Sequence, residues 1–278
     1  MANYTYENTS KFVTAAGVRI HYNELGSGYP LICIHGGGPG ANSWSNFRNN
    51  MDAFAPKYRA LLLDMPQFGE SEKVVITEGR LTYIARVLAD FMAQLAIEKT
   101  HFIGNSMGGQ AAIKLAIDHP HRVDHLVVIG STPMRHSIFT PMPVEGVKMI
   151  MKYYTGAGPS RDKMRDLLQT LVYNTSLITE EIVEERYKAS ADPETVELFT
   201  RRQPPLQVED LSGEMEKVAA KTLIVWGQDD RFGALDIGLT MLRKFQNARM
   251  HIFSKCGHWA QVEYADDFNR LVLDFLVH

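Results

Sequence analysis

Short runs of consecutive apolar residues recur along the chain, and each ends in a polar or glycine-rich turn. Runs this continuous are typical of strands that are buried on both faces of a sheet. Stretches with helical spacing, 81–95 and 109–117, lie between some of the runs. Strands that alternate with helices predict a mostly parallel sheet flanked by helices. The predicted strands are 31–34, 60–63, 101–103, 126–129, 222–225 and 250–253.

Two segments depart from this alternation. Residues 11–13 and 18–22 flank a glycine-containing turn, which predicts an antiparallel hairpin. From about 137 to 208 no strand-like run occurs, and helical periodicity is broken by proline and glycine, which predicts a helical cap inserted over the sheet edge. We therefore expect a first core part (1–136), a cap (137–208) and a second core part (209–278). The predicted cap helices are 147–154, 163–173, 180–189 and 196–202.

Composition narrows the possible functions. The 278 residues are 45% hydrophobic and 22% charged, as in ordinary globular proteins, and the net charge of −3 comes without a basic stripe for nucleic acid. No apolar run is long enough to span a membrane, and no secretory signal opens the chain, so we expect a cytoplasmic protein without a membrane partner. Cys33 and Cys256 make no disulfide framework. Neither metal-ligand spacing nor a cofactor motif is present, so we expect no metal and no cofactor.

The first candidate for chemistry is the string Gly104-Asn-Ser-Met-Gly108, which follows the predicted strand 101–103 and precedes small residues with helical spacing. A G-x-S-x-G string in this context is a nucleophile elbow, in which glycines permit a tight turn and Ser106 is held clear of the sheet. The N–H of Met107 would then point from a helix N-terminus toward a developing oxyanion. The alternative is a glycine-rich turn without chemistry.

The second candidate is His35-Gly-Gly-Gly-Pro-Gly40, directly after the predicted strand 31–34. Such a run supplies a second oxyanion N–H, and we expect Gly37 to be the donor, with Gly38 beside it. Each lost oxyanion donor typically costs ~3–4 kcal/mol of transition-state stabilisation. A phosphate-binding loop is the competing interpretation, but the Lys-Ser/Thr ending of such a loop is missing.

An acid and a base should follow the serine along the chain, in that order. Asp230 and Asp229 follow the predicted strand 222–225, and His258 follows the strand 250–253. His258 would accept the serine proton, and a carboxylate would orient its ring. We favour Asp230, three residues after a glycine, while Asp229 and, at another strand end, Asp64 remain alternatives. The other histidines are interpreted as structural.

Several motifs together resemble one family. The segments are His35-Gly-Gly-Gly-Pro-Gly-Ala-Asn-Ser-Trp-Ser-Asn46, Gly104-Asn-Ser-Met-Gly-Gly109, Trp226-Gly-Gln-Asp-Asp-Arg-Phe232 and Phe253-Ser-Lys-Cys-Gly-His-Trp-Ala-Gln261. They resemble the meta-cleavage product hydrolases, carbon–carbon bond hydrolases of bacterial aromatic catabolism with the α/β-hydrolase fold. The segments 141–146 and 173–181 resemble the cap of that family.

The resemblance implies a small-molecule substrate of the 2-hydroxy-6-oxohexa-2,4-dienoate type, which water cleaves to 2-hydroxypenta-2,4-dienoate and a carboxylic acid. Family members first convert the dienol to a keto tautomer, and the C6 ketone is then attacked. The resemblance also implies a homo-oligomer, a dimer or larger. It leaves open the C6 substituent and whether Ser106 or water attacks.

The resemblance also implies substrate contacts. Arg186 would hold the polar end of the dienoate, since arginine is a permanently charged fork donor. A surface ion pair is the alternative for Arg186, and Arg201 and Arg202 are rival cations. The remaining positions that we expect to bind substrate are Gly36, Gly38, Asn46, Asn105, Phe232, which forms a pocket wall, and Trp259.

The same residues also bear on other functions that this fold performs. An ordinary carboxylesterase would share Ser106, His258 and the oxyanion hole, but it would not need a cation at the far end of the cleft. A catalytically dead binding protein is the third hypothesis, and the complete set of triad residues argues against it. Epoxide hydrolases and dehalogenases of this fold use an aspartate nucleophile, so Ser106 argues against both.

Overall fold

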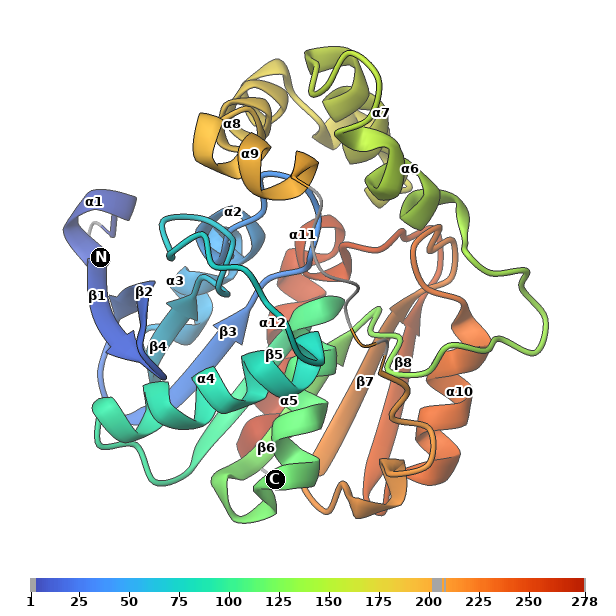
Figure 1. The fold of residues 1–278 in the computed structure, drawn as a ribbon. Helices are drawn as coiled ribbons and strands as arrows, with labels where there is room; N and C mark the ends of the chain where they lie inside the picture. The colour runs from blue at the N-terminus through green and yellow to red at the C-terminus, as the bar shows by residue number, and fades with distance from the viewer. Residues whose placement is uncertain (1–3, 202–206, 208, 278) are drawn as a thin grey trace.

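The computed structural model describes residues 4–201, 207 and 209–277. Its centre is an eight-stranded sheet in the order β1-β2-β4-β3-β5-β6-β7-β8 (Figure 1). The predicted hairpin is confirmed, since β1 (Ser10–Ala15) and β2 (Val18–Leu25) pair antiparallel. Strand β2 also pairs antiparallel with β4, and all later pairings are parallel. The parallel strands are β3 (Tyr29–Ile34), β4 (Tyr58–Leu63), β5 (Thr100–Asn105), β6 (Val123–Ile129), β7 (Lys221–Gly227) and β8 (Ala248–Phe253).

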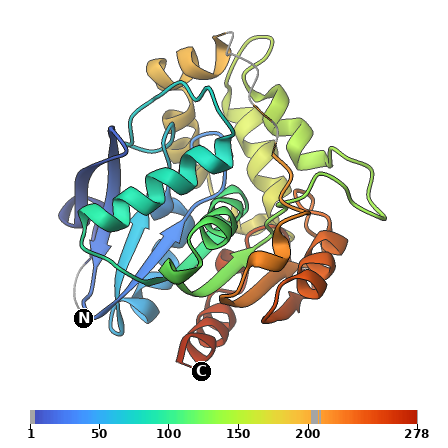
Figure 2. The same cartoon turned by 60° about the horizontal axis from the view of Figure 1, so that its bottom comes forward.

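Helices cover both faces of the sheet (Figures 1 and 2). Successive residues of a strand point to opposite faces, so Ile32 joins a core with α4, α5 and α10, while Leu31 and Cys33 join a second core with α2, α3 and α12. This double burial explains why the strands read as continuous apolar runs. The helices are α2 (Ser43–Phe47), α3 (Met51–Phe54), α4 (Arg80–Gln94), α5 (Met107–Asp118), α10 (Leu235–Lys244) and α12 (Ala265–Val277).

Four helices between β6 and β7 gather over the carboxyl ends of the parallel strands (Figure 1). They are α6 (Glu145–Tyr153), α7 (Arg161–Leu171), α8 (Glu180–Ser190) and α9 (Pro193–Thr200). Apolar side chains of α6, α7 and α8 form a core of their own, which also contains Phe232 and Trp259. Phe199 of α9 packs instead against the core that contains α4 and α5. The end of the predicted helix 196–202 and the predicted boundary at Val208 lie outside the described residues, and the division into core and cap parts stays a prediction.

Some elements were not predicted from the sequence, namely α1 (Tyr6–Thr9), α2, α3, α10, α11 (Ala260–Glu263) and α12. Most of these are single turns that sequence periodicity cannot resolve, whereas α12 is long and amphipathic. Cys33 and Cys256 are both free and buried. Within the described ranges, no helix combines the length and apolar character needed to cross a membrane.

Candidate active site

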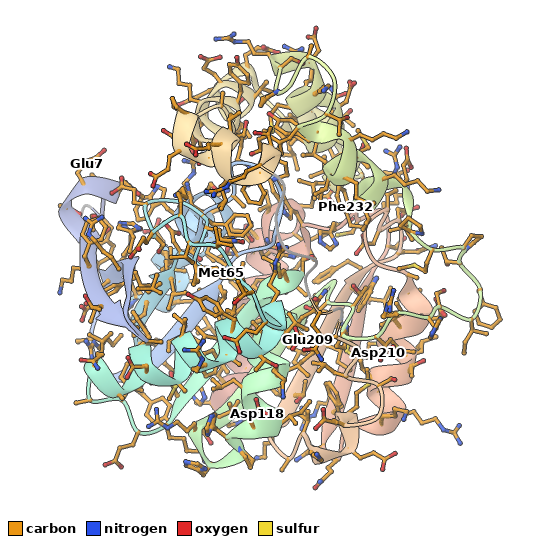
Figure 3. The ribbon with its side chains drawn as sticks, viewed as in Figure 1. Glu7, Met65, Asp118, Glu209, Asp210 and Phe232 are labelled. Carbon is orange, nitrogen blue, oxygen red and sulfur yellow. The ribbon has the colours of Figure 1, made fainter. Side chains whose placement is uncertain are left out.

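A cavity of about 190 Å³ lies between the carboxyl ends of the strands and the cap. The sheet side supplies Ser106 and His258, and the cap supplies Arg186 and Leu171. Phe232 stands where α6 meets the core (Figure 3). Of the residues predicted to act in catalysis or binding, the lining includes Gly36, Gly37, Gly38, Asn46, Asn105, Ser106, Met107, Arg186, Phe232, His258 and Trp259.

Ser106 occupies a sharp turn between β5 and α5. Its φ of 52° and ψ of −117° lie in a region that non-glycine residues rarely adopt. Its N–H donates to the carbonyl oxygen of Ile129 at 2.7 Å, which fixes the turn to β6. A Cβ at Gly104 would approach Gly109 Cα to 2.5 Å, and one at Gly108 would meet backbone oxygens of the glycine-rich loop at 2.5 Å. The strand and helix therefore approach closely only because these positions are glycine, and the strain holds Ser106 at the cavity.

His258 is joined to Asp230, which lies behind it and not on the cavity wall. The ring Nδ1 and Asp230 Oδ2 are 2.7 Å apart, and both side chains are almost completely buried. The other carboxylate oxygen accepts hydrogen bonds from the N–H groups of Phe232 and Gly233 at 2.7 and 2.9 Å. Asp230 is thus held in place from both oxygens. With Nδ1 engaged, Nε2 is the ring nitrogen left to face the cavity.

The two alternative acids lie elsewhere. Asp229 is exposed, and its backbone N–H donates to the carbonyl oxygen of Cys256 at 2.9 Å. Asp64 is buried and contacts His21 Nδ1 at 2.8 Å, while its other oxygen accepts the N–H of Ser43. Asp64 therefore braces the loop after β4 against the hairpin. His21, one of the histidines interpreted as structural, has this carboxylate as its partner.

The two predicted oxyanion donors lie side by side. Met107 is the first residue of α5, where a helix leaves the N–H without an intrahelical acceptor. A Cβ at Gly37 would come within 2.9 Å of the Met107 side chain, so only glycine lets the loop backbone approach so closely.

His35 anchors the glycine-rich loop, a function that the motif alone does not reveal. Its Nδ1 lies 2.7 Å from the carbonyl oxygen of Gly36, and its Nε2 accepts the N–H of Met65 at 3.0 Å. This pair of contacts requires the neutral ring with its proton on Nδ1. Burial lowers the pKa of His35 to about 4, so the ring stays neutral at pH 7.

Arg186 reaches the cavity from α8 and is 3% exposed. One guanidinium nitrogen donates to the carbonyl oxygen of Pro39 at 3.0 Å, whereas Nε and Nη1 have no hydrogen-bond partner among the described residues. The guanidinium carbon lies 5.6 Å from the ring centre of Trp259. Burial lowers the pKa of Arg186 to about 10, which leaves it charged at pH 7. A buried cation without a carboxylate is costly unless an anion joins it.

Comparison with known proteins places this chain in a family. A family model described as the alpha/beta hydrolase fold matches residues 29–265. The chain is 42% identical to the 2-hydroxy-6-oxo-6-phenylhexa-2,4-dienoate hydrolase of Comamonas testosteroni over 99% of both chains. The chain belongs to the meta-cleavage product hydrolases. Another relative from the same organism, the 2-hydroxy-6-oxononadienedioate/2-hydroxy-6-oxononatrienedioate hydrolase, is 42% identical over 100% of both chains.

Solved structures agree with this assignment. The meta-cleavage product hydrolase CumD of Pseudomonas fluorescens IP01 superposes with a TM-score of 0.87 and 33% identity, over 96% of this chain and 97% of CumD. The predicted α/β-hydrolase fold and the predicted family are therefore confirmed, and the chain is a hydrolase of the class that acts on carbon–carbon bonds.

Other residues of this meta-cleavage product hydrolase complete the cavity. Gln261 Nε2 donates to Asn46 Oδ1 at 2.9 Å, which leaves the Asn46 amide NH₂ as a donor for a ligand. Asn105 donates to the carbonyl oxygen of Ile129 at 3.2 Å, and its own Oδ1 has no partner within the described chain. Rival cation Arg201 is exposed, and Arg202 lies outside the described residues. The cavity is also lined by residues that the sequence did not predict as substrate-binding, namely Ala41, Gln110, Ile150, Leu167 and Leu171.

Proposed function

We propose that this enzyme hydrolyses the carbon–carbon bond between C5 and C6 of a 2-hydroxy-6-oxohexa-2,4-dienoate. The observation that carries the proposal is the buried Arg186 guanidinium, which lines the same cavity as Ser106 and whose Nε and Nη1 have no hydrogen-bond partner in the described part of the chain. The carboxylate end of a dienoate would supply the missing anion through charge-assisted hydrogen bonds. A carboxylesterase would have no use for a cation placed there, so the carboxylesterase alternative is not favoured.

The reaction requires two proton movements before the bond breaks. With its carboxylate on Arg186, the substrate passes from the 2-hydroxy dienol to the 2-oxo tautomer, which leaves a methylene at C5. His258 then accepts the Ser106 hydroxyl proton through Nε2, while Asp230 stabilises the imidazolium at Nδ1. Ser106 Oγ adds to the C6 ketone, and the N–H groups of Gly37 and Met107 receive the resulting oxyanion.

Collapse of the adduct breaks the C5–C6 bond. The electron pair of that bond moves into the 2-oxo-3-enoate. The His258 imidazolium gives its proton to the enolate oxygen, which yields 2-hydroxypenta-2,4-dienoate and leaves His258 neutral. The acyl group stays on Ser106 until a water, deprotonated by His258, releases it as a carboxylic acid and restores the hydroxyl. Water is the co-reactant, and no cofactor enters the proposal.

The cavity also points to the substituent on C6. Its far walls are apolar, with Ile150, Leu167, Leu171 and Phe232, and Arg186 is the one Lys or Arg among its described lining residues. A second carboxylate, as in the substrate named for the nonadienedioate relative, would have no counter-charge here. The volume of 190 Å³ is only slightly above the roughly 150 Å³ of an engineered cavity that holds benzene. The dienoate chain is itself larger than benzene, so it leaves little room in the cavity for the group on C6. We therefore infer a small uncharged alkyl substituent.

The decisive experiment follows the yellow colour of ring-fission dienoates with the purified enzyme, beside p-nitrophenyl acetate. Rapid bleaching of the methyl-substituted dienoate with slow ester turnover is the expected result. Fast ester cleavage with the dienoate unchanged would refute the proposal. The predicted cytoplasmic location and the predicted dimer or larger assembly stay predictions.

A further inference from the structure

A cluster of metal-ligand side chains that the proposed reaction does not use lies at the amino ends of β5 and β6, whereas the cavity lies at the carboxyl ends of the strands. The register between these strands shifts at this point, so His101 of β5 faces both Asp124 and His125 of β6. Neighbouring residues of a regular strand point to opposite faces, and a bulge re-aims one of them. The irregularity therefore lets two consecutive residues of β6 present their side chains to the same histidine.

The three side chains are close to the geometry of a metal site. Asp124 Oδ2 lies 3.6 Å from His101 Nδ1 and 3.8 Å from His125 Nδ1. One ligand atom from each residue can be chosen so that all lie within 4.8 Å of one another. Ligands around a tetrahedral zinc ion, with bonds of about 2.0–2.2 Å, sit roughly 3.3–3.6 Å apart. Small side-chain rotations would bring the cluster to that spacing.

Three of the four histidine ring nitrogens have no hydrogen bond to the described residues. Within the described chain, His101 Nδ1 and both ring nitrogens of His125 are buried without a hydrogen bond, and the His101 side chain is 6% exposed. Buried polar atoms are nearly always paired, so three unpaired nitrogens in one cluster need an explanation. Burial lowers the pKa of His101 to about 4, so its ring is neutral at pH 7. A neutral ring offers the lone pair that a metal ion needs.

Asp124 has neighbours that would hold its carboxylate in place as a metal ligand. Tyr29 donates its hydroxyl to Oδ2 at 3.1 Å and keeps its proton, since burial raises its pKa to about 12. Lys99 contacts the other oxygen, Oδ1, at 3.0 Å from a half-exposed position. Hydrogen bonds of this kind orient a ligating carboxylate. Asp124 is about one-third exposed, which leaves a side open for water as a fourth ligand.

We propose that His101, Asp124 and His125 bind one divalent transition-metal ion of the zinc class. Two imidazoles and one carboxylate suit Zn²⁺ and its neighbours, whereas Mg²⁺ and Ca²⁺ prefer oxygen ligands alone. The bound ion fastens the first residues of β5 to those of β6 and stabilises the folded chain by mass action. Because the site lies at the amino ends of these strands and Ser106 follows the carboxyl end of β5, the ion takes no part in turnover.

The test is a titration of chelator-treated enzyme with Zn²⁺ in competition with a chromophoric zinc indicator. Wild type should bind one equivalent, and its thermal midpoint should rise with Zn²⁺ but not with Mg²⁺. His125→Asn should weaken binding at least about tenfold and abolish the thermal shift. The matched control is His121→Asn, which alters an exposed histidine near His119 and should bind Zn²⁺ as wild type does.

Three outcomes would overturn the proposal. Equal Zn²⁺ binding by wild type and His125→Asn would place the ion elsewhere, and inhibition of dienoate hydrolysis in step with binding would place it at His258. Absence of binding by wild type would also refute it. If His125→Asn fails to fold, Asp124→Asn replaces it, because that residue is partly exposed and retains its shape.

Discussion

The backbone N–H of His258 donates a 2.7 Å hydrogen bond to the carbonyl oxygen of Leu171, the last residue of cap helix α7. Helix α7 therefore contacts the backbone of His258, the proposed general base, directly. Glu263 strengthens the connection, since one carboxylate oxygen accepts the N–H of Gly257 at 2.6 Å and the other accepts the N–H groups of Tyr173 and Asn174 at 2.9 Å. The position of the His258 loop is thus coupled to the segment that follows α7.

We expect Glu263→Gln to lower both stability and kcat. The amide has one acceptor oxygen where the carboxylate has two, so at least one backbone N–H loses a charged partner, at a cost of about 1.5–3 kcal/mol. Urea unfolding and dienoate hydrolysis measure the two effects, and the acid limb of the pH–kcat profile should shift because His258 is repositioned. Asp266→Asn, an exposed neighbour, is the control. An unchanged pH profile with lower stability would make Glu263 purely structural.

Ser106→Ala should abolish hydrolysis while leaving tautomerisation of the bound dienol intact. The hydroxyl is needed for attack on C6, whereas binding rests on Arg186 and the cavity walls. Turnover should fall by about 10³-fold or more. Stopped-flow absorbance distinguishes the steps, because the dienol and keto forms absorb differently. Turnover close to wild type would show that Ser106 is not the nucleophile.

Arg186→Gln should reduce kcat/KM for dienoates by roughly ten- to a hundredfold, the value of a charge-assisted hydrogen bond. Hydrolysis of p-nitrophenyl acetate, which has no carboxylate, should change little. Arg201→Gln, at an exposed cation, serves as the matched control and should leave both rates as they are. An equal loss on both substrates would show that Arg186 only supports the fold.

Ile150→Ala should widen substrate preference. Ile150 lines the apolar wall of the cavity, and its truncation makes room for a larger C6 group. The ratio of kcat/KM for phenyl- over methyl-substituted dienoate should rise several-fold. The adjacent Met151 is exposed, so Met151→Ala should leave the ratio unchanged. A wild-type enzyme that already prefers the phenyl substrate would contradict the inferred alkyl substituent.

Acid should destabilise the protein through His35. Its pKa falls from 6.5 to about 4 on folding, so the unfolded chain binds more protons between these values. Stability that is present above about pH 6.5 is therefore lost as the pH falls toward 4, by roughly 3 kcal/mol for this residue.

Urea unfolding between pH 7 and 4.5 measures this loss. His35→Gln offers an uncharged donor and acceptor to Gly36 and Met65, so its stability should depend less steeply on pH than that of wild type. His121→Gln, at an exposed histidine, should retain the full slope. Parallel curves for wild type and His35→Gln would contradict the assignment.

The strands and the nucleophile elbow could both be predicted from the sequence, but for different physical reasons. A parallel strand buried on both faces must be apolar throughout, and this leaves a clear trace at 31–34 and 126–129. The elbow is visible because its turn tolerates little but glycine. Helix α12 was missed although its amphipathic spacing could have revealed it. Helix α10 contains Gly238, which a helical pattern disfavours; a Cβ there would approach the Trp226 ring to 2.8 Å.

Contacts set by sheet register could not be predicted. Asp64 meets His21 because β4 and β2 pair, and His101 meets His125 because β5 and β6 shift register. Neither pairing follows from spacing along one chain. The hydrogen bonds of His35 also could not be predicted, since the motif indicates only that the glycines after it permit a close approach of the backbone.

The unpaired charge of Arg186 has a consequence for the lifetime of the protein. Without an anion the buried guanidinium lowers the stability of the fold, and an occupied site restores it by mass action. Proteases cleave unfolded chains, so an enzyme molecule with substrate bound is degraded more slowly than a substrate-free one. We expect the abundance of this enzyme to follow the supply of its substrate even where its rate of synthesis is constant.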